Sequence, residues 1–130
     1  MLSDSDKNII EELVLTYTIE EDVQPGGTWT GIIFSDYELP PGYDREKADM
    51  LVRLPPGFPD AAPDNCWIDP PIRNARTGTA PPNATGSETH HGRTWQFFSR
   101  HLTEAPWRPG LDDLRSWLNT IRRSLEQDGK

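Results

Sequence analysis

The placement of proline is the feature that most limits what this chain can fold into. Ten of the 13 prolines lie between residues 40 and 82, and proline removes a backbone donor and clashes with a preceding helical turn. Three clusters interrupt the chain: Pro40-Pro41-Gly42, Pro55-Pro56-Gly57-Phe58-Pro59 and Asp69-Pro70-Pro71. They exclude a long helix in this part of the chain. The short apolar segments between them, 49–54 and 65–68, are predicted to be strands joined by turns.

The N-terminal part predicts a helix followed by a hairpin. A helix is expected over residues 3–13, which begin with capping serine and aspartate residues and place three apolar residues on one face. Residues 14–19 and 28–34 are rich in β-branched and aromatic side chains, which is typical of strands. The turn-forming sequence Gln-Pro-Gly-Gly at 24–27 lies between them, so the two strands are expected to pair.

The C-terminal part predicts a loop and then two helices. Residues 70–90 contain several prolines and glycines and few apolar side chains, so we expect an irregular loop. Residues 92–102 carry Trp95, Phe98 and Leu102 at helical spacing. The clearest helical pattern comes last: Leu111, Leu114, Trp117, Leu118, Ile121 and Leu125.

This order of elements predicts the fold class. An N-terminal helix, a four-stranded antiparallel meander, an irregular loop and C-terminal helices together indicate an α+β fold. A chain of 130 residues has the length of one domain. We therefore expect residues 1–130 to form a single domain.

Charge is spread unevenly along the chain. Residues 1–65 carry four basic and 14 acidic side chains, a net charge of −10, whereas residues 66–130 carry a net charge of +2. The chain lacks the basic face that nucleic-acid binding needs and the run of about 18 apolar residues that a membrane span needs. The acidic half either attracts a basic protein partner or keeps the protein in solution.

The cysteine content and the N-terminal sequence predict where the protein works. A single cysteine, Cys66, excludes an internal disulfide framework. The polar, acidic N-terminus does not resemble a secretory signal. Both features favour the reducing cytoplasm. Cys66 stands beside Trp67 in a strand predicted to be buried, which disfavours its use as a nucleophile. The five tryptophans are expected to be core residues.

His90 and His91 are candidate functional residues, because histidine transfers protons and binds metals near neutral pH. Adjacent side chains of an extended segment point to opposite sides, so one metal ion cannot readily take both. We expect no metal site and no cofactor. Two alternatives stay open for these histidines: a structural ring hydrogen-bonded to loop backbone, and a functional role without metal.

Several motifs resemble the ubiquitin-conjugating-enzyme (UBC) superfamily. The proline segment 54–63 is similar to the family's Tyr-Pro-x-x-Pro-Pro, and Trp107-Arg108-Pro109-Gly110-Leu111 is similar to its Trp-Ser-Pro-x-Leu. The chain resembles above all the prokaryotic UBC-like family E, over about residues 5–125. The motifs are Leu39-Pro40-Pro41-Gly42-Tyr43-Asp44, Asp69-Pro70-Pro71, Glu88-x-His90-His91, Gly92-Arg93-x-Trp95-Gln96, Ser99-Arg100-His101-Leu102 and Trp107-Arg108-Pro109-Gly110.

The resemblance implies a UBC-like fold and a set of partners. Such bacterial proteins are associated with gene clusters that also encode ubiquitin-like proteins, ThiF-like activating enzymes and JAB-type proteases. The expected partners are therefore a ubiquitin-like protein and a ThiF-like activating enzyme or a conjugating partner. No nucleic acid and no membrane is expected among them.

The chain departs from the family at the catalytic position. The His-Pro-Asn triplet is absent, and the position about eight residues before Trp107, where the family has its cysteine, is Ser99. We therefore expect a non-catalytic subunit that binds the ubiquitin-like protein or its enzymes. The alternative is an atypical carrier that uses Ser99, a histidine (His90, His91 or His101) or Cys66. If residues 92–102 are helical, Ser99 and His101 point about 200° apart. An interaction protein unconnected with such modifiers is a third possibility.

Overall fold

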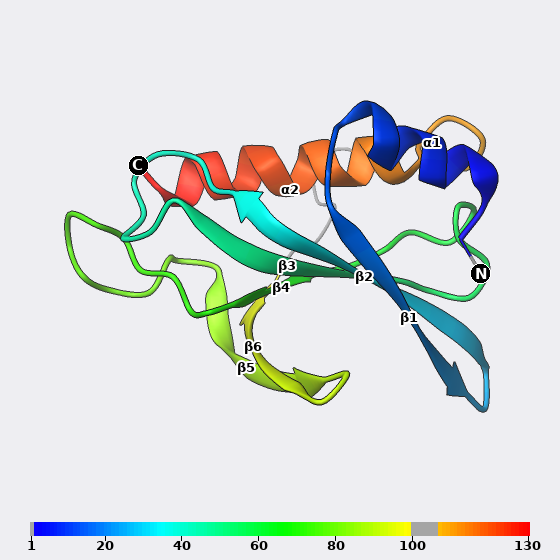
Figure 1. The fold of residues 1–130 in the computed structure, drawn as a ribbon, viewed down its shortest axis with the longest axis horizontal. Helices are drawn as coiled ribbons and strands as arrows, with labels where there is room; N and C mark the ends of the chain where they lie inside the picture. Colours follow the sequence, from blue (N-terminus) through cyan, green and yellow to red (C-terminus); the bar gives the residue numbers. More distant parts are fainter. Residues whose placement is uncertain (1, 100–106) are drawn as a thin grey trace.

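The computed structural model describes residues 2–99 and 107–130. One antiparallel sheet of six strands has the order β1-β2-β3-β4-β6-β5, and both helices cover one of its faces (Figure 1). The elements are α1 (Asp4–Glu12), β1 (Tyr17–Gln24), β2 (Gly27–Glu38), β3 (Lys47–Leu54), β4 (Cys66–Asp69), β5 (Ala84–His90), β6 (Arg93–Phe98) and α2 (Leu114–Asp128). The α+β class is confirmed. The prediction of four strands is wrong, since the sheet has six.

The two additional strands replace a predicted loop and a predicted helix. Strand β5 lies inside the segment expected to be irregular, and β6 lies where a helix over 92–102 was expected. The helical spacing of Trp95 and Phe98 was misleading because β6 carries one buried residue on each of its faces. Trp95 packs on the face away from the helices, whereas Phe98 packs toward them. The outward-facing residues of β5 are polar and exposed, so this edge strand had no apolar alternation to reveal it.

The turn between β5 and β6 explains how these strands pair. His91 and Gly92 both have positive φ, 53° and 74°, as a two-residue type I′ hairpin turn requires. The strands pair from His90 with Arg93 at the turn to Ala84 with Phe98 at the far end. A His-Gly turn lacks the asparagine or aspartate from which such a hairpin is usually predicted.

The main core lies between the sheet and the two helices. The inward side chains are almost entirely apolar and buried, so this layer supplies most of the burial that stabilises the fold. From the sheet they include Ile32, Phe34, Met50, Val52, Ile68 and Phe98; from the helices, Ile10, Leu114, Trp117, Ile121 and Leu125. Cys66 belongs to the same layer and has no exposed surface. The predicted burial of Cys66 is confirmed.

Helix α2 begins three residues later than the apolar pattern indicated. Asp113 is the N-cap: its carboxylate accepts a hydrogen bond from the backbone N–H of Ser116, and the Ser116 hydroxyl accepts one from Asp113. This reciprocal capping box fixes the first turn. Leu111, which the pattern included in the helix, precedes the cap and is 70% exposed. Within residues 107–130, α2 is the one helix that follows the sheet.

Candidate functional site

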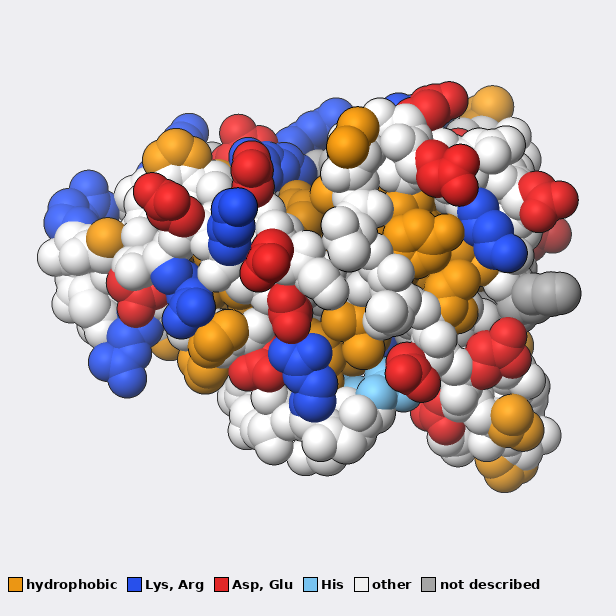
Figure 2. Space-filling view, viewed as in Figure 1, with side chains coloured by type: hydrophobic (Ala, Val, Ile, Leu, Met, Phe, Trp, Pro, Cys, Tyr) orange, Lys and Arg blue, Asp and Glu red, His pale blue; other side chains and the backbone are white. Residues whose placement is uncertain are grey.

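The face of the sheet away from the helices, which we call the outer face, carries the polar side chains that could do chemistry. A small apolar cluster of Ile33, Leu51, Trp67 and Trp95 lies at its centre. Figure 2 shows histidine in a recess between the β1–β2 hairpin and the β5–β6 hairpin. Polar and charged residues from five strands, β1, β3, β4, β5 and β6, surround the cluster.

His90 is held by a carboxylate and packed against a tryptophan. Its Nε2 lies 2.9 Å from Glu88 Oε1, and the same oxygen accepts a hydrogen bond of 2.9 Å from Trp67 Nε1. The His90 ring also meets the Trp67 ring edge-on, with centroids 5.1 Å apart. When the imidazole is neutral, donation from Nε2 to Glu88 leaves Nδ1 as the nitrogen that can accept a proton. A histidine oriented by a carboxylate in this way is suited to proton transfer.

The electrostatics of this pair centre on Glu88. The hydrogen bond to His90 holds the pKa of the Glu88 carboxyl below its ordinary value, and the bond from Trp67 acts in the same direction. Partial burial opposes these bonds but is outweighed. Glu88 is therefore an anion at neutral pH, which is the state in which it orients His90.

Arg53 adds a cation on the other side of Trp67. Its guanidinium carbon lies 5.1 Å from the centre of the Trp29 ring and 5.9 Å from that of Trp67. Its Nη2 donates a hydrogen bond of 2.8 Å to Asp22 on β1. The Nε atom of Arg53 is buried and has no hydrogen-bond partner among the described residues. Arg53 thus links β1, β2, β3 and β4 across the outer face.

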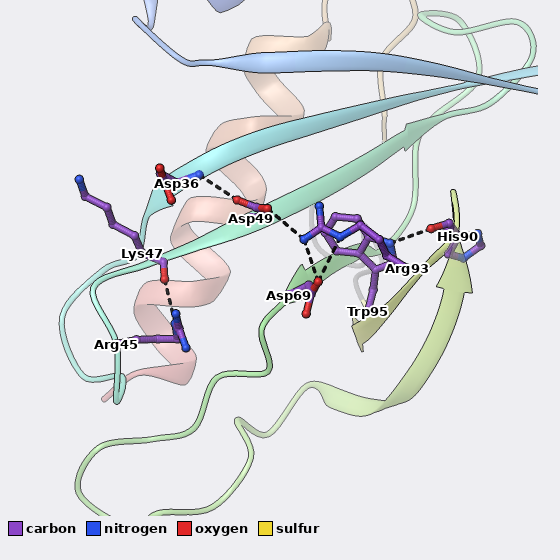
Figure 3. A network of polar contacts seen from close by, with 8 residues as sticks. All are labelled: Asp36, Arg45, Lys47, Asp49, Asp69, His90, Arg93 and Trp95. Atoms are coloured by element: carbon purple, nitrogen blue, oxygen red, sulfur yellow. Dashed lines mark hydrogen bonds and ion pairs between the residues drawn. The ribbon is translucent and has the colours of Figure 1, made fainter.

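A second arginine neutralises two facing carboxylates (Figure 3). Asp49 of β3 stands directly opposite Asp69 of β4 in the register of the sheet. Arg93 donates hydrogen bonds of 2.9 Å to Asp49 and 2.7 Å to Asp69, while its guanidinium stacks 4.3 Å above the Trp95 ring. Like charges placed opposite each other destabilise a sheet, so Arg93 is the residue that makes this pairing tolerable.

His91 lies against Gly31 of β2, whereas His90 contacts Glu88 and Trp67. A Cβ built at Gly31 would lie 2.7 Å from His91 Nε2. This nitrogen is buried and has no hydrogen-bond partner among the described residues. The missing side chain at Gly31 therefore creates the space into which the tip of the β5–β6 hairpin folds.

Ser99 lies at the opposite end of the hairpin from both histidines. Its N–H donates to the carbonyl of Asn83 at 3.0 Å, and its hydroxyl lies 3.2 Å from that of Thr85. A seven-residue strand such as β5 spans about 20 Å. The structure therefore does not bring Ser99 together with His90 or His91. His101 lies outside the described residues.

The two segments that carry the UBC resemblance meet in space. Trp107 Nε1 donates a hydrogen bond of 2.7 Å to the carbonyl of Pro59, and the Phe58 and Trp107 rings lie 6.0 Å apart. The proline-rich turn after β3 is thereby attached to the segment that leads into α2. These contacts join residues 48 and 49 positions apart in the sequence.

Sequence reasoning named the histidines but missed their partners. Glu88, Arg53 and Arg93 were not proposed as site residues, because their roles depend on which residues the strand register places opposite one another. The one available signal was the spacing of Glu88 and His90, two residues apart, which puts both on one face of a strand. Within residues 2–99 and 107–130, no group of three or more His, Cys, Asp or Glu side chains could hold a metal ion.

Comparison with known families defines the class of protein. Residues 2–128 match the family described as prokaryotic E2 family E, and the antiparallel sheet with helices on one face agrees with an E2-like fold. The chain belongs to this family, as the sequence motifs predicted. Membership indicates a role in a bacterial ubiquitin-like conjugation system. No curated protein and no solved structure matches the chain. In the described part of the chain, no helix is long and apolar enough to cross a membrane.

Proposed function

We propose that this protein is a non-catalytic E2-like subunit that binds a ubiquitin-like protein, or its ThiF-like activating enzyme or conjugating partner, in the bacterial cytoplasm. The observation that carries the proposal is the burial of Cys66, the one cysteine of the chain. A thioester carrier needs a thiolate that a large acyl donor can reach. A thiol packed between β4 and the helices does not meet that need.

The surroundings of Ser99 support the same proposal. A serine nucleophile needs a neighbouring base to take its proton. His90 and His91 lie a strand length away.

The second candidate function is an atypical carrier that uses Ser99, a histidine or Cys66. The pairing of His90 with Glu88 favours it, because a carboxylate-oriented imidazole is a common element of proton-transfer sites. Such a carrier would hold the ubiquitin-like protein as an ester, an acyl-imidazole or a thioester. Each of these adducts has its own sensitivity to hydroxylamine or thiols.

Intact-mass analysis separates the two functions. The protein is incubated with a ubiquitin-like protein and a ThiF-like activating enzyme from the same organism, with ATP and Mg²⁺, and is measured under native and denaturing conditions. We expect a complex under native conditions and the unmodified chain mass after denaturation. An adduct that survives denaturation would contradict the proposal. Loss of that adduct in Ser99→Ala, His90→Gln or Cys66→Ala would then identify the carrier residue.

A further inference from the structure

We propose that the outermost edge of the sheet, formed by residues 13–24 at the end of α1 and along β1, is a docking surface for a partner protein. We call it the α1–β1 edge. Its occupant is an extended, lysine- and arginine-rich segment that adds to β1 as a further strand. The proposal goes beyond the adaptor role and holds equally if the protein is a carrier.

The position of β1 makes strand addition possible. All eight residues of β1 pair with β2 in unbroken register, from Tyr17 opposite Phe34 to Gln24 opposite Gly27. No strand of the described chain pairs with the other side of β1. The β1–β2 hairpin also extends away from the helices (Figure 1). An edge of this kind presents backbone donors and acceptors to an incoming extended segment.

Exposed hydrophobic side chains are concentrated on this edge. The described residues include five large hydrophobic side chains that are exposed, and four of them belong to the edge: Leu13, Val14, Ile19 and Val23. Val14 is 89% exposed and adopts a left-handed backbone with φ of 55°, an unfavourable conformation for a β-branched residue. Figure 2 shows hydrophobic side chains gathered between α1 and the β1–β2 hairpin, with acidic side chains and a basic side chain around them. The fold itself gains little from this exposed apolar surface.

A groove next to the start of β1 offers a place for an apolar side chain of the partner. It has a volume of about 680 Å³ and a mixed lining, in which Leu13, Leu15, Tyr37 and Leu118 lie beside charged residues that include Lys47 and Arg122. Thr16, the residue directly before β1, also lines it. A strand added along β1 would reach this groove at one of its ends. Specificity in strand addition comes from such side-chain pockets, while backbone bonds supply affinity.

Charge determines which kind of segment fits the edge. Asp22 on β1 and Glu12 on α1 are already paired with Arg53 and Arg115. Glu20 and Glu21, which precede Asp22 on β1, and Glu11 on α1 carry further negative charge at this edge. Lysine and arginine side chains of an added strand would complement these carboxylates and raise the association rate. A second copy of this chain is the wrong occupant, because pairing two β1 edges would set carboxylates against carboxylates. The acidic run thus prevents self-association and selects a basic partner.

The test uses a synthetic peptide of the stated chemistry. An eight-residue peptide of alternating lysine and valine, with blocked ends, matches the length of β1. It is titrated into the ¹⁵N-labelled full chain while backbone amide signals are recorded. We expect shifts and slower hydrogen exchange in residues 13–24, and shifts in groove residues such as Tyr37 and Leu118, with little change in β5 and β6. Shifts confined to other parts of the chain, or no binding, would overturn the proposal.

Two control peptides separate strand addition from simple attraction of charges. The first carries glutamate in place of lysine and is expected not to bind. The second keeps lysine but is N-methylated at alternate backbone nitrogens, so that one edge cannot donate hydrogen bonds. We expect it to bind at least about tenfold more weakly, because several backbone bonds are lost. Equal binding of the methylated peptide would overturn strand addition.

A pair of matched variants tests the location on the protein. Glu20→Lys reverses a charge on the exposed edge, and Glu126→Lys makes the same change on an exposed residue of α2. Binding of the lysine-valine peptide should weaken about fivefold in Glu20→Lys, the scale of an exposed pair turned from attraction to repulsion. Glu126→Lys should leave it within about twofold. Equal weakening in both variants would mean that only net charge matters and would contradict the proposed surface.

Discussion

The two faces of the sheet differ in what covers them and in what holds the cover in place. The inner face is covered by α1 and α2, and its side chains form one large apolar cluster. The outer face has a cluster of only four buried residues, Ile33, Leu51, Trp67 and Trp95. It is covered at one side by the β5–β6 hairpin, which Arg93, Glu88 and His91 attach to the rest of the sheet through specific contacts.

The inner face therefore supplies most of the stability, whereas the outer face carries the candidate functional groups. An apolar layer resists change through its total buried area, so its residues serve the fold. The contacts of the outer face depend on single polar groups. His90 and Glu88, the two groups suited to proton transfer, are among them. Changes on the inner face should therefore unfold the protein, whereas changes on the outer face should displace one hairpin.

The largest effect is expected from Phe34→Ala on the inner face. Phe34 has no exposed surface, and truncation of a buried phenylalanine costs about 3–5 kcal/mol through lost burial and a residual cavity. Urea unfolding followed by circular dichroism measures the loss. Val23→Ala, on a side chain that is 79% exposed, is the control and should change stability by less than about 0.5 kcal/mol. Similar losses in the two variants would refute the division into faces.

A smaller effect is expected where the hairpin tip meets β2. In Gly31→Ala the new methyl would lie 2.7 Å from His91 Nε2 and 3.1 Å from the Glu20 carbonyl. Overpacking of this kind costs about 1–3 kcal/mol. Gly26→Ala is the matched control, since no atom lies within 4 Å of a Cβ there, and it should be close to neutral.

The double variant shows whether His91 is the obstacle. Once His91 is truncated to alanine, the further change Gly31→Ala should cost less than about 1 kcal/mol, because the nearest clashing atom is gone. Thermal unfolding measures the stability of the unchanged protein, of Gly31→Ala, of His91→Ala and of the double variant, which together form a double-mutant cycle. If Gly31→Ala is equally costly with and without His91, the contact between hairpin tip and β2 does not position the hairpin.

The third expectation concerns Arg93. In Arg93→Gln the carboxylates of Asp49 and Asp69 face each other without a cation. We expect a loss of about 1 kcal/mol, limited by the partial exposure of all three side chains. High salt should reduce the loss, because it screens the repulsion between the two carboxylates. Arg93→Lys retains the charge and should recover part of the stability. A loss that salt leaves unchanged would point to the stacking on Trp95 instead.

The same comparison explains how much could be predicted from the sequence. The inner face was predicted well, because Trp117, Ile121 and Leu125 repeat at helical spacing and the proline clusters delimit the strands. The outer hairpin was missed, because the two buried residues of β6, Trp95 and Phe98, lie on opposite faces at a helical spacing, and β5 is polar on its exposed face. His90 could be named from its residue type. Its contact with Glu88 follows from their spacing once β5 is known to be a strand. Its contact with Trp67 could not be predicted, because it depends on the register of strands far apart in the sequence.

The smallest expected effect is that of Glu88→Gln, and its pH dependence is the informative part. The amide can still accept from Trp67 and His90, so the variant removes mainly the charge. Because the folded pKa of Glu88 is lowered, its ionised form stabilises the protein above the ordinary glutamate pKa of about 4.3. That contribution disappears as the pH falls through the lowered folded pKa.

Since Glu88 is 44% exposed, the variant should lose no more than about 0.5 kcal/mol at pH 7. The difference from the unchanged protein should shrink as the pH is lowered from about 4.3 toward 3, as measured by urea unfolding at each pH. A difference that stays constant over this range would mean that Glu88 holds His90 and Trp67 through geometry alone. In that case the charge of Glu88 does not contribute to the stability of the hairpin.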